Sequence, residues 1–126
     1  MPTSIIRNIC IFGVGGVGGY FGGKIAYFLQ NKADKYKVFF IARGIHLEEI
    51  RKNGLILNTS DKKGIVCKPA MVTDDVKEIP PPDLCFICVK AYDLDNAITQ
   101  LSDVLKENSI IIPLLNPSLS KKSKNI

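Results

Sequence analysis

The sequence predicts an α/β fold in which a doubly wound parallel sheet carries helices on both faces. Short apolar runs alternate with amphipathic segments, which is typical of successive β–α–β units. The apolar runs are nearly continuous, as expected for strands that are covered on both faces. A cluster of glycines separates the first apolar run from the first amphipathic segment. These observations predict a single domain at residues 1–116, followed by a polar tail at residues 117–126.

Strands are expected at residues 5–12, 36–42, 83–89 and 109–115, and helices at residues 16–30, 45–52 and 94–105. The apolar side chains of the helices recur at spacings of three and four residues. Asn53 and Gly54 are a typical helix stop, and Asp93 is the expected cap of the last helix.

Two short apolar runs, at residues 55–58 and 65–71, flank a polar turn and predict a small hairpin inserted before the third of these strands. The run Thr73, Asp74 and Asp75 then predicts the start of a short turn or helix. The three prolines at residues 80–82 end that segment, because proline cannot continue a helix.

Gly13, Gly15 and Gly18 have the G-x-G-x-x-G spacing of a dinucleotide-binding turn, and they lie between a predicted strand and a predicted helix. In such a turn the first glycine permits a sharp bend, the second lets backbone N–H groups reach a pyrophosphate, and the third lets the helix pack closely. The free N–H groups and the positive dipole end of the helix attract the anion. The sequence therefore predicts a Rossmann-like domain.

Arg43 follows the second predicted strand, where a domain that prefers NAD usually has an acidic residue. A guanidinium binds a 2′-phosphate through charge-assisted hydrogen bonds, so Arg43 predicts a preference for NADPH. Lys90 follows a later strand at the same edge of the sheet and is expected to contact cofactor or substrate. His46, the single histidine, is expected to shape the mouth of the cofactor site or to have no chemical role.

The charge of the chain gives little support to a nucleic-acid function. The net charge is +5, but Lys121, Lys122 and Lys124 carry three of these charges in the tail, and no basic stripe follows a helix. We therefore expect no nucleic-acid partner. The longest uncharged run, residues 8–23, is too short to span a bilayer, and the N-terminus lacks a secretory signal pattern. We expect a cytoplasmic protein with no membrane partner.

Cys85 and Cys88 have C-x-x-C spacing, but they lie within a predicted buried strand. Residues three apart on a strand point to opposite faces, so the two thiols are not expected to converge. The second cysteine pair that a zinc ribbon needs is missing. Together with Cys10 and Cys67 they are expected to be buried free cysteines, and no metal site is predicted.

Over residues 5–116 the chain resembles the N-terminal domain of the ketopantoate reductase (2-dehydropantoate 2-reductase) family. The resemblance depends on segments that occur in the family's order and rough spacing, namely G-V-G-G-V-G-G-Y-F-G-G, A-R-G-I-H, N-G-L-I-L, T-D-D, V-K-A-Y-D-L-D-N-A and I-I-P-L-L-N. It implies NADPH-dependent reduction of a small 2-oxo acid, ketopantoate, to pantoate on the route to pantothenate and coenzyme A.

The resemblance also implies roles for particular residues. The glycine turn would bind the pyrophosphate, and Arg43 would bind the 2′-phosphate. Lys90 and Asn116 would lie near the nicotinamide end, and Asn116 would also contact the substrate. The residues expected to bind the cofactor are Gly13, Val14, Gly15, Gly16, Val17, Gly18, Arg43, Lys90 and Asn116.

Two departures from the family pattern lead to further expectations. The family usually continues with glycine after the residue matching Asn116, whereas here a polar tail without apolar periodicity follows and is expected to be disordered. The family's helical second domain, which supplies its catalytic lysine, is absent from this sequence. We therefore expect no catalytic residue in this chain, weak NADPH binding and poor or no activity, as in a truncated product, a frame-shifted product or a deliberate fragment.

Two alternative functions remain open from the sequence. One is a non-catalytic NADP-binding or redox-sensing module, which would bind NADPH without a catalytic partner chain. The other is the cofactor domain of a different 2-hydroxy acid dehydrogenase, against which Arg43 and the V-K-A-Y segment weigh. Apolar surface that a second domain would cover also predicts homo-oligomers, and a strictly monomeric elution profile at high concentration would count against that expectation.

Overall fold

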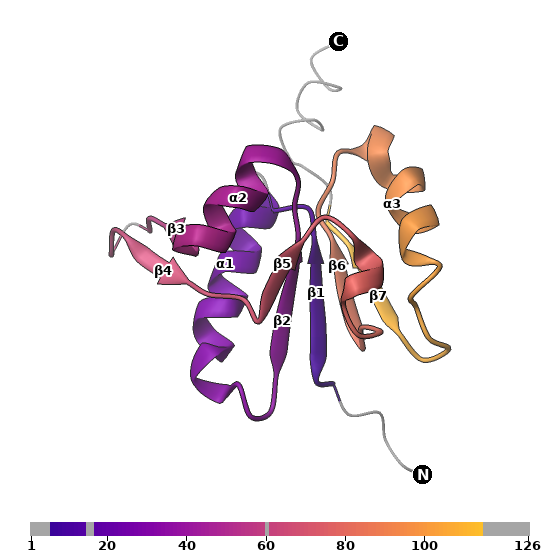
Figure 1. The fold of residues 1–126 in the computed structure, drawn as a ribbon, viewed down its shortest axis with the longest axis horizontal. Coiled ribbons are helices and arrows are strands. Elements are labelled where there is room, and N and C mark those ends of the chain that lie inside the picture. Colours follow the sequence, from indigo (N-terminus) through magenta and orange to yellow (C-terminus); the bar gives the residue numbers. More distant parts are fainter. Residues whose placement is uncertain (1–5, 15–16, 60, 115–126) are drawn as a thin grey trace.

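The computed structural model describes residues 6–14, 17–59 and 61–114 of the chain. Within these residues the centre is a five-stranded sheet with strand order β5-β2-β1-β6-β7, in which every neighbouring pair is parallel (Figure 1). The strands are β1 (Asn8–Phe12), β2 (Lys37–Ile41), β5 (Met71–Thr73), β6 (Leu84–Ile87) and β7 (Ile110–Pro113). The predicted parallel α/β sheet is confirmed.

Helices cover both faces of the sheet. The helices α1 (Val17–Leu29) and α2 (Gly44–Asn53) pack on one face, and α3 (Leu94–Leu101) packs on the other (Figure 1). The connecting segments contain short 3-10 helices at Gln30–Lys32, Val76–Glu78 and Ala91–Asp93. The sheet is therefore doubly wound, as the sequence predicted.

Two apolar layers, one on each face of the sheet, explain the composition of the strands. Ile11 and Phe40 point into the layer beneath α1 and α2. Their neighbours Cys10 and Phe39 point into the layer beneath α3, together with Leu101 of that helix. Because successive strand residues point to opposite faces and both faces are covered, β1 and β2 need apolar residues at nearly every position.

The prediction that residues 65–71 form a single hairpin strand was wrong. The antiparallel hairpin consists of β3 (Leu55–Leu57) and β4 (Ile65–Cys67), and it ends at Cys67. The chain then returns to the main sheet as β5, which pairs in parallel with β2. Thr73 consequently belongs to a strand and does not start a turn. Short apolar runs do not reveal their pairing partner, because tertiary contacts decide it.

The last helix is shorter than predicted. It ends at Leu101, and not at residue 105, and a tight turn follows in which the carbonyl oxygen of Leu101 accepts the N–H groups of both Val104 and Leu105, at 2.9 and 3.0 Å. The side chains of Val104 and Leu105 still pack against the layer beneath α3. The apolar periodicity therefore continued past the point where the helix stops.

The remaining predicted elements differ from the observed ones by a few residues at their ends. The first strand begins at Asn8, although the apolar run starts earlier. The predicted stop after α2 is confirmed: Gly54 has φ +80° and donates its N–H to the carbonyl oxygen of Ile50 at 2.8 Å.

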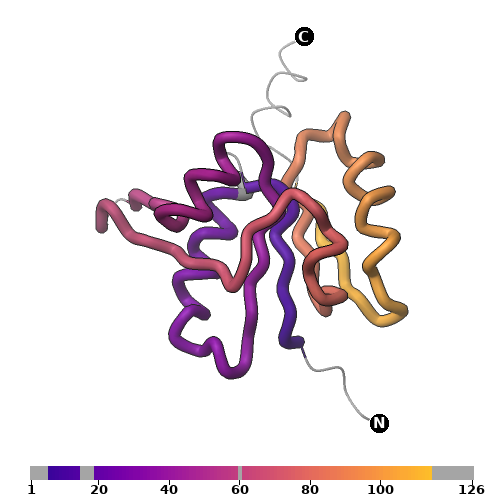
Figure 2. Tube along the Cα trace, in the orientation of Figure 1, coloured from indigo at the N-terminus to yellow at the C-terminus, as the bar shows by residue number. Residues whose placement is uncertain are grey.

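The hairpin packs against α1, and a glycine makes this contact possible. A Cβ atom on Gly23 would lie 3.1 Å from Cδ2 of Leu55 and 3.6 Å from Sγ of Cys67. The trace of the hairpin accordingly lies to the side of the main sheet, next to the helices of that face (Figure 2). Gly23 therefore lets the hairpin pack closely against α1.

The strand β7 is the least covered part of the sheet. Ile110, Ile111 and Ile112 are 47%, 37% and 38% exposed, and β6 is the partner of β7 among the described residues. Exposed apolar side chains on an edge strand favour association with another chain. The expectation of homo-oligomers stays a prediction.

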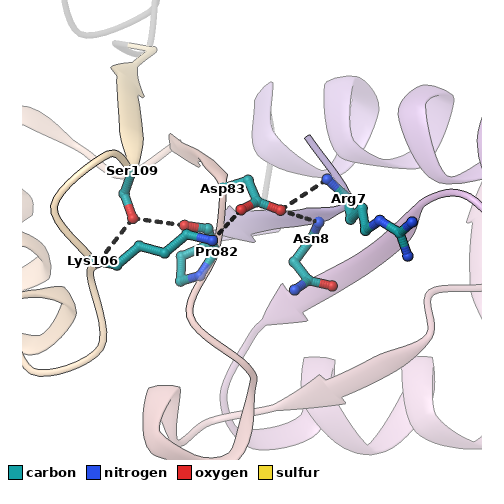
Figure 3. A network of polar contacts seen from close by, with 6 residues as sticks. All are labelled: Arg7, Asn8, Pro82, Asp83, Lys106 and Ser109. Carbon is teal, nitrogen blue, oxygen red and sulfur yellow. Dashed lines mark hydrogen bonds and ion pairs between the residues drawn. The ribbon is translucent and has the colours of Figure 1, made fainter. Parts of the chain in front are cut away.

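Asp83 joins three segments at the amino ends of the strands (Figure 3). Its Oδ2 accepts the N–H groups of Arg7 and Asn8, both at 2.8 Å, and its Oδ1 pairs with Nζ of Lys106. Ser109 completes the network by donating its hydroxyl to the carbonyl oxygen of Pro82 at 2.7 Å. The Asp83 side chain is 12% exposed, so its charge depends on these partners.

The hydrogen bonds of this network keep Asp83 charged. Burial alone would raise the pKa of Asp83, but the Asn8 N–H, the Lys106 ammonium and the Arg7 N–H outweigh burial and hold the pKa below its usual value. A carboxyl group whose pKa is lower in the folded than in the unfolded chain stabilises the fold above its unfolded pKa. This stabilisation is lost as the pH falls through the folded pKa.

Replacing Asp83 by asparagine should lower the free energy of unfolding at pH 7 by about 1 kcal/mol, since hydrogen bonds to a charged acceptor are stronger than those to a neutral one. The difference from the unchanged chain should shrink as the pH is lowered through the folded pKa, because the native carboxyl then also becomes neutral. Urea denaturation at a series of pH values measures this. Asp34→Asn, in the exposed loop before β2, is the matched control. An equal loss in that control, or a loss independent of pH, would contradict the role of Asp83.

Candidate functional site

A cavity of about 310 Å³ opens where the central strands end. Strand order places β2 on one side of β1 and β6 on the other, so the chain leaves β1 at the point where the winding of the sheet reverses. Ligands of open α/β sheets bind at this position, outside the carboxyl ends of the strands. The cavity is lined by Phe12, Gly13, Val14, Ile41, Ala42, Arg43, His46, Asp74, Val89, Asp93, Asn96, Ala97 and Gln100.

Gly13 forms the turn after β1, and its backbone lies between two neighbouring strands. Its N–H donates to the carbonyl oxygen of Ile41 at 3.0 Å, while the N–H of Cys88 donates to the carbonyl oxygen of Phe12 at 2.8 Å. Gly13 has φ +93°, and a Cβ atom there would lie 2.8 Å from the carbonyl oxygen of Cys88. Both the backbone conformation and the space therefore require glycine.

Glycines further along α1 let the helix approach this turn. A Cβ atom on Gly22 would lie 2.9 Å from Cγ2 of Ile11, and one on Gly19 would lie 2.5 Å from the carbonyl oxygen of Val14. The helix thus packs directly on β1 through Gly22. The contacts of Val17 and Gly18 are not described, although both residues lie in the first turn of α1.

Arg43 lies at the end of β2, as predicted. It is exposed, lines the cavity and is the residue before α2, with an extended backbone at φ −136°. The ion pairs of the described residues, Glu48 with Arg51 and Asp83 with Lys106, do not include it. Its guanidinium is therefore available to an anion in the cavity.

His46 shapes the cavity, which was one of its two expected roles. Its Nε2 lies 3.0 Å from the carbonyl oxygen of Val14. Since a carbonyl oxygen can only accept, this nitrogen carries the hydrogen. The contact links the start of α2 to the glycine turn, so His46 holds two walls of the cavity together.

Several polar residues of the cavity were missed by the sequence analysis. Asp74 was hidden because β5 was assigned to the hairpin, so the end of this strand was not recognised as part of the site. Asn96 and Gln100 lie four residues apart on α3 and face the cavity together. The spacing of these two amides, opposite the apolar face of the helix, was the available signal.

Asp93 is the N-cap residue of α3, as predicted, but it does not cap the helix through its side chain. Its side chain makes no capping hydrogen bond and instead lines the cavity. The N–H of Asp93 is bonded to the carbonyl oxygen of Lys90 in the 3-10 turn that precedes α3. Because this turn leads directly into the helix, Asp93 has helical dihedral angles and cannot form the extended conformation of a typical cap.

Lys90 lies just after β6, but among the described residues it is its neighbour Val89 that lines the cavity. Its Nζ is 6.0 Å from the ring centroid of exposed Tyr92. Gly15, Gly16 and Asn116, which the sequence also assigned to the site, lie outside the described residues. Gly13, Val14 and Arg43 are thus the predicted site residues that the structure brings together around one cavity.

The four cysteines are free thiols, of which Cys10, Cys67 and Cys85 are buried, as predicted, and Cys88 is half-buried. Cys85 points into the layer beneath α3, whereas Cys88 packs against the opposite layer. A hydrogen bond with Cys85, together with burial, raises the pKa of Cys10, and burial raises that of Cys67. Burial and the neighbouring Cys85 raise the pKa of Cys88 to about 11. The raised pKa values of Cys10, Cys67 and Cys88 disfavour the thiolate that a redox-active cysteine needs.

No group of three or more His, Cys, Asp or Glu side chains in the described part of the chain is arranged to hold a metal ion. In the same residues, no helix is long and apolar enough to cross a membrane.

The parallel sheet, the glycine turn after β1 and the cavity at the strand ends define a Rossmann-like α/β domain. Comparison with known protein families then gives the particular family. Residues 9–121 match the family described as "Ketopantoate reductase PanE/ApbA". The chain belongs to this family, as the sequence motifs predicted.

Individual relatives agree with the family. The chain is 33% identical over 106 residues to an uncharacterized oxidoreductase, YkpB, of Bacillus subtilis, and 30% identical over 109 residues to a 2-dehydropantoate 2-reductase of Mesorhizobium japonicum. Among solved structures, a 2-dehydropantoate 2-reductase of Porphyromonas gingivalis W83 is similar with a TM-score of 0.80 and 33% identity.

The similarity covers most of this chain but a smaller part of its relatives. It includes 84% and 86% of the chain for the Bacillus and Mesorhizobium proteins, and 94% for the Porphyromonas structure. The chain spans about a third of the length of the two curated relatives, 32% and 31%, and 42% of the Porphyromonas chain.

Replacing Gly13 by alanine should destabilise the chain by about 1–3 kcal/mol more than replacing Gly44 by alanine, because only the first change forces a Cβ atom against a strand. Gly44 is the matched control, since it also has a positive φ (+61°) but nothing lies within 4 Å of its Cβ position. Thermal and urea unfolding of the two variants measure the difference. Equal losses would contradict the close approach at Gly13.

Proposed function

We propose that this chain binds NADPH for an oxidoreductase that reduces the 2-oxo acid ketopantoate to pantoate, a step toward pantothenate and coenzyme A. The observation that carries this proposal is the position of the Gly13 turn beside Arg43 in one cavity at the ends of β1 and β2. Membership of the ketopantoate reductase family supports the reaction. The names of the Mesorhizobium and Porphyromonas relatives support it in the same way.

The residues at the cavity fit a phosphorylated dinucleotide. Gly13 lets the chain turn sharply beside Cys88, so that the glycine turn leads into the N-terminus of α1, where free N–H groups would hold a pyrophosphate. Arg43 supplies a cation for a 2′-phosphate. When bound, the reduced nicotinamide supplies a hydride to the carbonyl carbon of the 2-oxo acid, and the carbonyl oxygen takes up a proton.

We propose that residues at the ends of the later strands hold the other end of the cofactor. Lys90 follows β6, which is the neighbour of β1 on the side away from Arg43. An ammonium at this position can attract the carboxylate of a 2-oxo acid or a polar group of the cofactor. Asn116, outside the described residues, is the further candidate for contact with nicotinamide and substrate.

Titration with NADPH and NADH tests the cofactor assignment. NADPH should bind about ten-fold or more tightly than NADH, since charge-assisted hydrogen bonds to a phosphate contribute about 1.5–3 kcal/mol each. Arg43→Ala should remove this preference. Arg7→Ala, an exposed arginine at the start of β1, is the matched control and should retain it. Equal affinities that are unchanged by Arg43→Ala would contradict the role of Arg43.

We further propose that the chain alone reduces ketopantoate poorly. A ketone accepts hydride readily only when a proton donor or an electrophile is in place. Among the described residues, His46 is a candidate donor, but it lies on the Arg43 side of the cavity and its Nε2 hydrogen is directed to Val14. Oxidation of NADPH at 340 nm should therefore remain near the background rate after addition of ketopantoate. Substantial turnover by the purified chain would contradict this proposal.

A further inference from the structure

Asp74 lies at the end of β5 and lines the same cavity as Gly13 and Arg43. Its carboxylate belongs to neither ion pair of the described residues and takes part in no hydrogen bond there. A carboxylate on the wall of a cavity can accept hydrogen bonds from a ligand and cannot donate any while it is charged.

The residues on either side of Asp74 are held in place. Thr73 is buried, donates its hydroxyl to Glu78 and accepts the N–H of Asp75 at 3.1 Å. Asp75 in turn accepts the N–H of Lys77 at 3.0 Å and starts the short helix Val76–Glu78. The structure therefore fixes the backbone that carries Asp74, while it leaves the carboxylate itself without a partner.

The ends of three neighbouring strands place Gly13, Arg43 and Asp74 in a row. The N–H of Ala42 donates to the carbonyl oxygen of Thr73 at 3.0 Å, and the next residues along these two strands are Arg43 and Asp74. Gly13 is joined to β2 in the same way, through the carbonyl oxygen of Ile41. Adjacent strands are about 4.8 Å apart, so the row runs across the carboxyl ends of three adjacent strands, from β1 through β2 to β5.

We propose that Asp74 selects an adenine base by accepting a hydrogen bond from its exocyclic 6-amino group. This inference rests on the proposed function, in which the pyrophosphate lies at Gly13 and the 2′-phosphate lies at Arg43. In the dinucleotide the adenine base follows the ribose that carries the 2′-phosphate. With the 2′-phosphate at Arg43 after β2, the base would lie next to the following strand end in the row, which is the end of β5 with Asp74.

The rest of the cavity suits a purine ring. Ala42 and Ala97 are buried and present apolar surface from the sheet and from α3. Asn96 and Gln100 line the α3 side and can both donate to and accept from ring nitrogens. A hypoxanthine base, which has an oxygen in place of the 6-amino group, would set an acceptor against the Asp74 carboxylate.

Isothermal titration with NADP and with nicotinamide hypoxanthine dinucleotide phosphate tests the inference by binding alone. The unchanged chain should bind the hypoxanthine form about ten-fold or more weakly, because a hydrogen bond to a charged acceptor is lost and two acceptors face each other. In Asp74→Asn the amide can donate to the 6-oxygen, so the two affinities should agree within about three-fold.

Two further variants separate this inference from the proposed function. Arg43→Ala should weaken both ligands by a similar factor and leave their ratio unchanged. Asp34→Asn, which removes the same charge in the exposed loop before β2, should behave as the unchanged chain. Binding of NADP that depends on Arg43 but does not distinguish the bases would overturn the role of Asp74 alone. Discrimination that persists in Asp74→Asn would also overturn it, and failure of both ligands to bind would overturn the proposed function as well.

Discussion

The close approach of the β1–α1 turn to its neighbouring strands is the constraint on which the rest of the site depends. The backbone at Gly13 is hydrogen-bonded to β2, and Phe12 just before it accepts the N–H of Cys88 after β6. A side chain at Gly13 would meet the Cys88 carbonyl, and one at Gly22 would meet Ile11. Because these contacts leave no room for a Cβ atom, the turn, the start of α1 and the strand ends on both sides have fixed relative positions. That geometry creates the cavity that Arg43 and Asp74 line.

Polar side chains at the amino ends of the strands differ from those at the carboxyl ends in whether they form ion pairs. At the edge where the strands begin, Asp83 is satisfied by two backbone N–H groups and by Lys106. At the edge where the strands end, Arg43 and Asp74 line a cavity without forming an ion pair. A paired buried charge stabilises the fold, whereas an unpaired charge at a cavity retains its capacity to bind a ligand. Paired charges thus lie where the strands begin, and charges outside the described ion pairs lie where they end.

The elements nearest the glycine turn were predicted most accurately. The spacing of Gly13, Gly15 and Gly18 predicts a strand, a turn and a helix, and β1 and α1 lie there. Arg43 was correctly placed at a strand end because β2 is a continuous apolar run with a clear boundary. By contrast, β5 is three residues long and was assigned to the hairpin, so Asp74 was not recognised as a site residue. The structure shows close packing at Gly19, Gly22 and Gly23 of α1, whereas the packing expected of Gly18 stays a prediction.

The sequence by itself determined the parallel α/β class, the position of the glycine turn and the family, because each depends on local patterns of glycine and apolar residues. Tertiary structure decided which side chains meet in the cavity. Asp74, Asn96 and Gln100 come from segments far from the turn, and they join it only because β5 pairs with β2 and α3 covers the opposite face. Such pairing depends on contacts between distant residues, and short apolar runs do not encode their partners locally. The glycine turn therefore predicted where the cavity lies, and the strand order supplied the residues around it.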